Sequence, residues 1–574
     1  MLRNLLGAGK GLQRAVHESA TLGPFPGILR GMSSRHVLIV LVLVLGLAGS
    51  AAPGGSTTGP PTVRTQPTFF ISGHGWGHGL GMPQYGAFGY AQHGWRWDRI
   101  IKHYFPGTTI GQEPVERVRV LLAASVKRAT IGSKLPIQVV DGAGKKHPLD
   151  AGTYAVGAAF KLADPTNPQA KPQPLTYPLE FKPGATALTF NGRGYRGSLR
   201  ILKVGPAKVR VVNVVDVDMY LRGVVPSEMP KDWAPEALKA QAVAGRSYAL
   251  SHLRGGSGGF DLYPDTRDQV YLGIPHEAPS TNAAVNATAG QVVLYKGKVA
   301  RTYFFSSSGG RTASVQDLYP DSPPIPYLVS VSDPYDTISP YHNWGPYRFA
   351  ARKLAKALKS PGKLLDVQTT AAASGRVQSV VATGAKGEST VTGADVRSAL
   401  GLRSTWFQVG VLSLGAPAAP VTYGTAAALS GTARGVPSVD LQEQAADGSW
   451  NTVSTLKPRG GAVAPKVKPD QSSKFRLIVG TIASDPVHVA VAPSARLHIP
   501  PALTGFWGTV RPGAAGTTVT VQRQAGTAWR PVVQLKTTAK GRFTISQTVT
   551  PGTYRVRVSA KGFAPGFSKP VTAS

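Results

Sequence analysis

The stretch YLRGVVPSEMP at residues 220–230, followed closely by PEALKAQAVAGR at residues 235–246, decides how this chain is expected to fold and act. Helical periodicity covers residues 234–253, with Pro235 at its start and an acid in its first turn, where the positive end of a helix favours negative charge. The sequence therefore predicts a helix there, preceded by an apolar turn in which two prolines fix the backbone around Glu228.

Glu228 is the candidate for acid chemistry. Its neighbours Val224, Val225 and Met229 are apolar, and apolar surroundings raise the pKa of a carboxyl toward the value that a general acid needs near neutral pH. Two alternatives remain at this point. Arg222 or Arg246 could hold a substrate oxygen or pair with Glu228 and lower its pKa, and local composition alone favours an ordinary solvated or paired turn glutamate.

A second signature, GHGWGHGLGMPQYGA, occupies residues 73–87. His74 and His78 have a spacing that suits a metal pair on a helix, but the alternating glycines disfavour a helix. We expect a strand and loop whose glycines let another backbone or a glycan approach closely. The sequence identifies no third metal ligand, so the histidines are expected to pack or form hydrogen bonds beside a cleft. A third segment, YFFSSSGGRT at 303–312, could cradle sugar hydroxyls or form a β-turn.

Composition limits the class of protein. The 574 residues favour three to four domains. The formal charge of +34 attracts polyanions. Since the basic residues look scattered and no nucleic-acid module accompanies them, anionic polymers of a cell wall or a membrane surface are favoured as partners over nucleic acid. The chain has no cysteine, which excludes disulfides, thiolate zinc sites and cysteine nucleophiles.

Composition also predicts the organisation of the chain. The apolar run VLIVLVLVLGLA at 37–48 is shorter than a spanning helix and precedes small residues, which indicates a secretory signal peptide, with an uncleaved membrane anchor as the alternative. The expected order is an upstream segment of unclear status (1–31), the signal peptide (32–52), a Pro/Gly-rich linker (53–66), an α+β domain (67–413) and two β-sandwich modules (416–494 and 495–574). The mature protein is therefore expected to be secreted or associated with the cell wall.

Within the α+β domain, strand-like runs cover 118–122 and 201–214, and helical periodicity covers 350–358 and 393–400. After residue 415 the chain repeats itself with a period of about 75 residues, which fits a pair of immunoglobulin-like sandwiches. For these modules a role as spacers or adhesive units without chemistry is favoured.

Together, the motifs resemble the SpoIID/LytB family of cell-wall proteins. The resemblance rests on the Glu228 segment and its helix, DTRDQVY at 265–271, FFSSSGGRT at 304–312, and the glycine–histidine segment followed by HYFPGT at 103–108. It covers roughly residues 69–410. In the family the glycine–histidine segment follows the glutamate segment, whereas here it precedes it. The chain therefore looks circularly permuted, and the strand near Phe69 and Phe70 should lie beside Trp406 and Phe407.

The resemblance implies an α+β SpoIID-like domain, a mixed sheet with packed helices, that acts on peptidoglycan. Characterised SpoIID-like members are lytic transglycosylases that cut between N-acetylmuramic acid and N-acetylglucosamine, and their essential glutamate corresponds to Glu228. It implies a cleft lined by Arg246, Tyr248, Gln269, Tyr271, Ser306, Ser307, Ser308, His78, Gln84 and Tyr85. Some relatives bind a structural zinc through cysteines that are absent here, so no metal or other cofactor is expected. LytB-type relatives enhance an amidase, which makes a non-catalytic amidase enhancer or glycan-binding cell-wall protein the alternative. A zinc hydrolase that uses His74 and His78 is the third.

Overall fold

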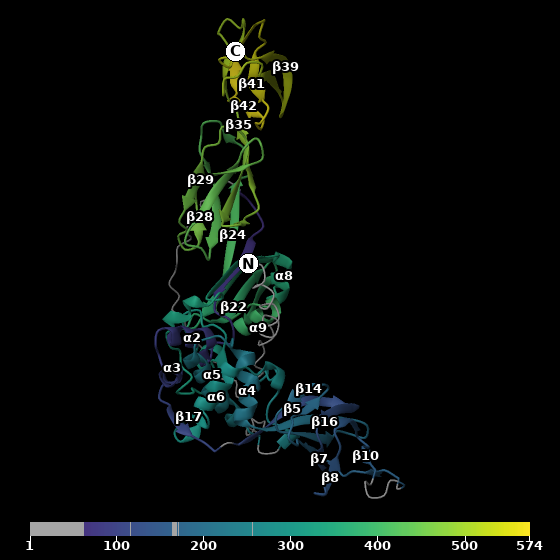
Figure 1. The fold of residues 1–574 in the computed structure, drawn as a ribbon. Helices are drawn as coiled ribbons and strands as arrows, with labels where there is room; N and C mark the ends of the chain where they lie inside the picture. The colour runs from purple at the N-terminus through teal and green to yellow at the C-terminus, as the bar shows by residue number, and fades with distance from the viewer. Residues whose placement is uncertain (1–61, 115, 164–168, 170, 255–256) are drawn as a thin grey trace, which may run out of the picture.

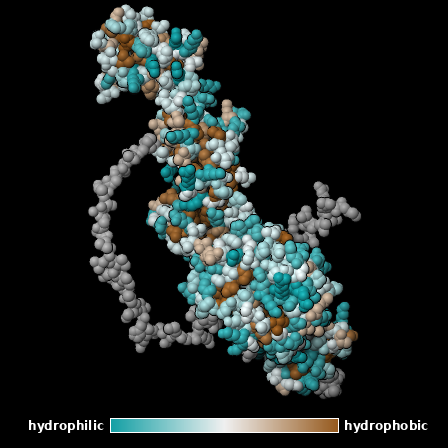
Figure 2. All heavy atoms as spheres, turned by 90° about the vertical axis from the view of Figure 1, so that its left-hand side faces the viewer, coloured by the Kyte–Doolittle hydropathy of each residue, from teal (hydrophilic) through white to brown (hydrophobic). Residues whose placement is uncertain are grey.

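The computed structural model describes residues 62–114, 116–163, 169, 171–254 and 257–574. The molecule is elongated, with an α+β body at one end and two β-rich modules that follow one another toward the C-terminus (Figure 1). The predicted upstream segment and signal peptide, residues 1–52, lie outside the described residues. Among the helices that are described, none combines the length and the apolar character needed to cross a membrane. In Figure 2 hydrophilic residues cover much of the visible face, and hydrophobic residues form small separate patches.

The part of the body farthest from the C-terminus is an antiparallel six-stranded sheet in the order β5-β16-β15-β12-β7-β8 (Figure 1). The strand predicted at 118–122 is part of β5 (Arg117–Val126). The run at 201–214 is a hairpin of two strands, β15 (Ser198–Lys203) and β16 (Val209–Asp216), because Gly205 adopts a φ of +75° between them. The other strands of the sheet are β7 (Ile137–Val140), β8 (Lys146–Leu149) and β12 (Leu179–Lys182).

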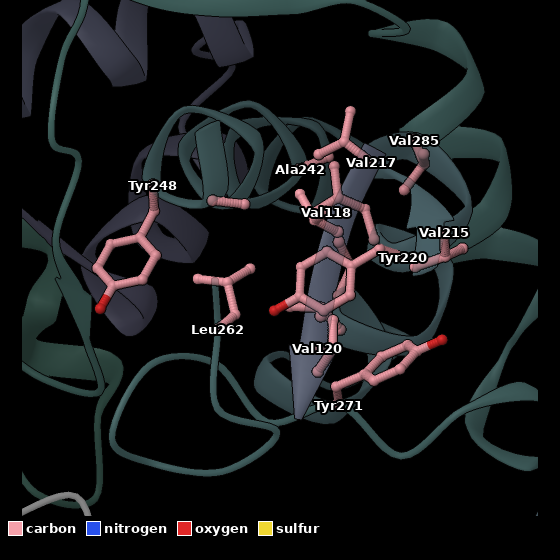
Figure 3. Packing of buried hydrophobic residues seen from close by; sticks show 14 of the residues in the cluster. Val118, Val120, Val215, Val217, Tyr220, Ala242, Tyr248, Leu262, Tyr271 and Val285 are labelled. Atoms are coloured by element: carbon pink, nitrogen blue, oxygen red, sulfur yellow. The ribbon is translucent and has the colours of Figure 1, made fainter. Parts of the chain in front are cut away.

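Strand β16 leads directly into the helical part of the body. Its helices are α2 (Gln84–Gln92), α3 (Trp97–Tyr104), α4 (Val217–Glu228), α5 (Pro235–Ser251) and α6 (Pro279–Ala287). The helix predicted over 234–253 is α5. Its small residues Ala237, Ala240 and Ala244 are fully buried, which allows the neighbouring helices to pack closely. Figure 3 shows side chains of α4, α5 and α6 meeting valines of β5 in one core.

The strands of the body do not form the single mixed sheet that was expected. They divide into several sheets, and among the described strands of the body only β3 (Met82–Pro83) and β19 (Phe304–Phe305) pair in parallel. A second antiparallel sheet, β14-β13-β6-β9, packs beside the six-stranded one; its strands are β6 (Arg128–Ser133), β9 (Gly152–Gly157), β13 (Leu188–Phe190) and β14 (Arg193–Tyr195). The body is therefore α+β, but its sheets are small and mostly antiparallel.

The pairing of strand β2 (Thr68–His74) explains the unusual order of the motifs. It lies antiparallel between β20 (Asn343–Phe349) and β24 (Phe407–Pro417), with Gly73 opposite Phe407 and Phe69 opposite Val411. The backbone N–H of His74 also donates to the carbonyl of Trp406 at 2.9 Å. The prediction that the strand near Phe69 lies beside Phe407 is confirmed, as a circular permutation requires.

A smaller subdomain precedes β24. It contains α8 (Ala351–Ala357) and α9 (Gly393–Leu400), which correspond to the helices predicted at 350–358 and 393–400. Between them runs an antiparallel sheet of β21 (Leu364–Ala371), β22 (Val377–Gly384) and β23 (Gly387–Thr392). These elements share one apolar core with Phe69 and Ile71 of β2.

Strand β24 crosses the position where the body was expected to end. Val409 and Val411 pack in the core of the α8–α9 subdomain, whereas Leu412 and Leu414 pack in the core of the first sandwich. In addition, Thr62–Arg64 forms β1, which pairs with the end of β24. These three residues were assigned to the linker 53–66 from their composition, and their pairing corrects that assignment. The body and the first sandwich are therefore joined by a continuous strand.

The two C-terminal modules share one pattern of strand pairing. In the first, β28 (Val439–Gln444) lies between β29 (Trp450–Leu456) and β32 (Ser473–Val479). In the second, β38 (Thr518–Ala525) lies between β39 (Ala528–Lys536) and β41 (Gly552–Ser559). In both modules an arginine of one flanking strand packs over a tryptophan of the other. The guanidinium carbon of Arg476 lies 4.1 Å from the ring centroid of Trp450, and that of Arg555 lies 4.3 Å from the ring centroid of Trp529. Both modules are all-β, and the internal repeat of the sequence reflects a repeated structure.

Candidate active site

A cleft of about 740 Å³ opens where the glycine–histidine segment meets the end of α4. Aromatic and proline side chains form much of its wall, and Glu228 is one of its residues. The lining comprises Trp76, Gln84, Tyr85, Pro226, Glu228, Pro230, Lys231, Asp232, Trp233, Pro275, His276, Glu277, Ala278, Ser306, Pro340 and Tyr341. Of the residues expected in the cleft, Glu228, Gln84, Tyr85 and Ser306 are present.

Glu228 is the last residue of α4, so the apolar turn expected around it is the C-terminal turn of a helix. Pro226 lies inside that helix and removes one backbone donor. The carboxyl group is partly buried and has two partners: Oε1 accepts the backbone N–H of Val270 at 2.8 Å, and Oε2 accepts Nε2 of Gln84 at 3.3 Å. The carboxyl is therefore held between two segments that are distant in sequence.

Burial raises the pKa of Glu228 to about 7, and the hydrogen bonds from Val270 and Gln84 offset only part of that effect. Neither arginine considered as a partner pairs with it. Arg246 pairs with Asp218, and Arg222 donates to Asn286 at 3.0 Å. A carboxyl that is close to half protonated near neutral pH can both give and accept a proton.

The glycine–histidine segment reaches the cleft by lying against the segment at 303–309. Glycines 75, 77, 79 and 81 all have positive φ, and a Cβ on Gly81 would lie 2.1 Å from the carbonyl oxygen of Tyr303. The glycines thus allow two backbones to approach closely, which is one of the two expectations for them. Strand β3 then pairs with β19, and Gln84 follows as the first residue of α2.

The DTRDQVY segment contributes its backbone to the cleft. Gln269 is fully buried; its Oε1 accepts the hydroxyl of Tyr220 at 3.1 Å and its Nε2 donates to the carbonyl of Gly245 at 3.2 Å. Tyr271 is also buried and donates to Oδ1 of Asn213 at 2.8 Å. These two side chains were expected to line the cleft. Instead they point into the core and fix the intervening Val270, whose N–H binds Glu228.

Arg246 and Tyr248 of α5 likewise lie outside the cleft. Arg246 is fully buried, forms an ion pair with Asp218 at 2.6 Å and donates to the carbonyl of Gln291 at 2.9 Å. Tyr248 is buried and donates to Asp268 at 3.0 Å. A contact with substrate was expected for both. Their burial corrects that expectation, and their contacts tie α5 to α4 and to the DTRDQVY segment.

Three further residues expected in the cleft have structural contacts instead. His78 is partly buried; its Nε2 donates to the carbonyl of Phe304 at 3.0 Å, while Nδ1 accepts the N–H of Leu80 at 3.1 Å. Ser307 is buried and donates to Asp336 at 2.9 Å. Ser308 is also buried and binds Asp336 through its backbone N–H at 2.9 Å. Only Ser306 of the three serines reaches the cleft.

Of the aromatic residues in the wall of the cleft, only Tyr85 was expected from the sequence; Trp76, Trp233 and Tyr341 were not. The rings of Trp76 and Tyr341 pack edge-on with their centroids 4.3 Å apart, and the rings of Tyr85 and Trp233 pack edge-on with their centroids 4.9 Å apart. Trp76 and Trp233 lie within or beside the quoted motifs, so their proximity to Glu228 could have been proposed. Tyr341 belongs to none of the motifs, and no sequence signal marks it.

Metal binding was the least favoured interpretation of the histidines. His74 packs against the Trp406 ring with a centroid distance of 4.8 Å. Both ring nitrogens of His78 have protein partners, and burial lowers its pKa to about 3, which keeps the ring neutral. Across the described part of the chain, no three His, Asp or Glu side chains are grouped so that they could hold a metal ion.

The fold and the cleft define an α+β protein with a partly buried carboxyl of raised pKa in an aromatic groove, and comparisons with known proteins give its family. The SpoIID family, described as stage II sporulation protein, matches residues 206–295, which include Glu228, α5 and Val270. Stage II sporulation protein D of Bacillus amyloliquefaciens is 33% identical over 246 residues, covering 38% of this chain and 68% of that protein. The chain therefore belongs to the SpoIID/LytB family.

Two other relatives align over shorter stretches. The amidase enhancer of Bacillus subtilis is 38% identical over 116 residues, which is 20% of this chain and 15% of that protein. An uncharacterized protein of Brachyspira hyodysenteriae is 40% identical over 145 residues, 25% of this chain and 39% of that protein. The chain thus spans less than half the length of these two relatives. Among solved structures, a two-domain fibronectin type III segment of chicken tenascin aligns with 28% of this chain and 95% of its own length, at 16% identity and a TM-score of 0.19.

Proposed function

We propose that this protein is an exported peptidoglycan lytic transglycosylase in which Glu228 is the single acid and base. The observation that carries the proposal is the carboxyl of Glu228, which lies in an open cleft with a pKa raised to about 7. Membership of the SpoIID/LytB family supports a role at the cell wall. The aromatic wall of Trp76, Tyr85 and Tyr341 suits a ligand with apolar ring faces, such as a glycan.

The proposed reaction uses one carboxyl twice. Protonated Glu228 first donates its proton to the glycosidic oxygen between N-acetylmuramic acid and N-acetylglucosamine, and the bond from that oxygen to the muramoyl C1 breaks. The carboxylate then removes the proton from the muramoyl C6 hydroxyl, and the freed oxygen bonds to C1. The products are a 1,6-anhydro-muramoyl end and an N-acetylglucosamine end. The proton returns to Glu228, and no water is consumed.

A hydrolase would need a second carboxylate as nucleophile or base. The cleft contains two other acids. Arg196 donates to both carboxylate oxygens of Glu277, at 2.6 and 2.8 Å, so both oxygens are already engaged. Asp232 is exposed at the rim of the cleft. Asp232 is therefore the residue that distinguishes the two reaction classes.

The test compares the wild-type chain with Glu228→Gln and Asp232→Asn on purified peptidoglycan strands, with muropeptides analysed by mass spectrometry. We expect anhydro-muramoyl ends from wild type and Asp232→Asn, and a loss of at least a hundredfold in Glu228→Gln, since general acid catalysis contributes about 10²–10⁴. Loss of activity in Asp232→Asn together with reducing ends in the wild type would contradict the proposal.

A second function is favoured by one observation, the similarity to the amidase enhancer of Bacillus subtilis. In this alternative the protein is a non-catalytic modifier that binds a wall amidase or its glycan substrate. It predicts that wild type produces no new glycan ends, that it stimulates a separate wall amidase, and that Glu228→Gln stimulates the amidase equally well. Retention at the wall through anionic polymers is part of both proposals, because the formal charge of the chain is +34.

A further inference from the structure

The last module has a high net positive charge for its length because it contains no acidic residue. Residues 495–574 carry eleven Lys and Arg and no Asp or Glu, whereas residues 416–494 carry seven Lys and Arg and five Asp and Glu. The net charges are thus +11 and +2, although the two modules have the same strand pairing. Like charges on one small domain repel one another and oppose its folding. The first module has the same strand pairing with a much lower net charge, so the charge of the second module is not required by the fold.

One sheet of this module combines the charge with an exposed aromatic surface. It consists of β36 (Ser494–His498), β37 (Gly505–Arg511) and β40 (Arg542–Ser546) in that order. Phe506 and Val510 of β37 are buried, and the intervening Trp507 points to solvent with 48% of its surface exposed. The outward side chains of this sheet, which we call the Trp507 face, therefore alternate with the core residues of the module.

The strand register places the outward residues in two rows. His498, Trp507 and Thr544 form one row across the three strands; Arg496, Thr509 and Arg542 form the next. The imidazole of His498 stacks on Trp507 with ring centroids 4.0 Å apart and an interplanar angle of 11°. Both arginines are exposed. Adjacent rows on one face are about 7 Å apart and adjacent strands about 4.8 Å, so the aromatic pair lies directly beside two cations.

We propose that the Trp507 face binds an acidic polysaccharide. A flat, exposed indole–imidazole pair offers a platform for the apolar face of a sugar ring. Guanidinium groups bind carboxylates and phosphates through paired hydrogen bonds, so Arg496 and Arg542 would hold the anionic groups of the next residue of the polymer. The choice of a polysaccharide over a nucleic acid, whose bases and phosphates could use the same two features, rests on the proposed function at the cell wall.

The module therefore has a role beyond that of a spacer. It would hold the catalytic body near wall glycans through a polymer distinct from the one in the Glu228 cleft. Since Glu228 takes no part in this binding, the two proposals can fail separately: Glu228→Gln should bind the polymer as wild type does, and loss of polymer binding should leave the type of glycan end unchanged.

The experiment measures dissociation constants of the full chain for immobilised polymers by biolayer interferometry. The probes are polygalacturonate, which carries carboxylates, and a phosphomannan, which carries phosphates. Dextran supplies rings without charge, polyphosphate supplies charge without rings, and single-stranded DNA tests the nucleic-acid alternative. We expect the full chain to bind at least one acidic polysaccharide at least tenfold more tightly than each of the other three. Stronger binding to polygalacturonate or to phosphomannan would identify the anionic group.

Three variants localise the binding. Arg496→Gln/Arg542→Gln should weaken binding at least tenfold, and Trp507→Ala at least fivefold. The control, Arg530→Gln/Lys561→Gln, removes the same charge from exposed positions of the same module outside the Trp507 face and should change binding less than twofold. Equal losses in the control and the test variant, tighter binding to DNA, or no binding to either acidic polysaccharide would overturn the proposal. The arginine variant keeps the test decisive if Trp507→Ala unfolds.

Discussion

Nε2 of Gln84 lies 3.3 Å from Oε2 of Glu228, although the two residues are 144 positions apart in the chain. Gln84 belongs to the glycine–histidine segment and Glu228 to the end of α4. Their contact means that the two motifs form one site, with the first motif orienting the acid supplied by the second. The reversed order of the motifs does not disturb this arrangement, because β2 pairs with β24 and returns the first motif to its place.

Replacing Gln84 should change the pH dependence of the reaction. The amide of Gln84 donates to the charged form of Glu228 and lowers its pKa, so Gln84→Leu should raise that pKa. Since protonated Glu228 starts the reaction, the alkaline limb of the kcat/KM profile should move to higher pH, by up to about one unit. Gln92→Leu, at the exposed end of α2, is the control and should leave the profile unchanged. A shift of the limb to lower pH would contradict the assigned contact.

The raised pKa of Glu228 also predicts how stability depends on pH. The carboxyl binds its proton more tightly in the folded chain, with a pKa of about 7, than at the ordinary value of 4.5. Stability is therefore lost as pH rises from 4.5 to 7, by about 3 kcal/mol. Glu228→Gln removes this cost, so in chemical denaturation it should be more stable than wild type at pH 8 and equally stable below pH 4.5. A difference that is independent of pH would show that the carboxyl is not desolvated.

The sequence predicted the elements of the fold better than their assembly. Periodicity located α5, α8 and α9, with start signals for α5 as well, and the permutation followed from comparing the order of motifs. The turn at Gly205 was missed although the Gly205-Pro206 pair is a turn signal in the sequence. The strand β1 was missed because a polar spacer looks the same in sequence whether or not it pairs. The crossing of β24 between two cores was missed because a strand shows no sequence signal where its core partner changes.

The candidate site was predicted at its reactive group and less well around it. Apolar neighbours pointed to Glu228, but local composition alone favoured an ordinary turn glutamate, and the resemblance to the SpoIID/LytB family decided the choice. Gln269 and Arg246 were expected to touch substrate because polar residues in motifs often do. The structure buries them, and their polar atoms bind backbone carbonyls and an acid instead. A sequence motif does not distinguish a residue that touches substrate from one that holds such a residue in place, because both keep the same site intact.

A substitution at Gly223 of α4 tests whether Tyr271 holds the backbone N–H of Val270 in place. A Cβ at this position would lie 2.7 Å from Cε2 of Tyr271, so Gly223→Ala should displace that ring and with it the N–H that binds Glu228. We expect a loss of about 1–3 kcal/mol in unfolding free energy and a fall in kcat of at least tenfold. Gly194→Ala is the control, since its new methyl would meet Ile274 at an ordinary 3.5 Å. Wild-type kcat in Gly223→Ala would show that Tyr271 does not position the acid.

His78 provides a test of the glycine–histidine loop. Its neutral ring forms two hydrogen bonds, so His78→Leu should destabilise the protein by about 2 kcal/mol at pH 7. Because burial lowers the pKa of the wild-type ring to about 3, the wild type loses stability as pH falls below 6.5, and the variant lacks this loss. The difference in unfolding temperature between wild type and His78→Leu should therefore be smaller at pH 4.5 than at pH 7. A larger difference at pH 4.5 would contradict a neutral His78.

The most direct test of the central claim is the source of the oxygen at the new glycan end. Peptidoglycan strands are digested by the wild-type chain in water enriched in ¹⁸O, and the released fragments are weighed by mass spectrometry. Attack by the muramoyl C6 hydroxyl, with Glu228 as acid and then base, predicts 1,6-anhydro ends that contain no ¹⁸O and are absent with Glu228→Gln. Reducing ends that carry ¹⁸O would contradict the account, because they would require water as the nucleophile.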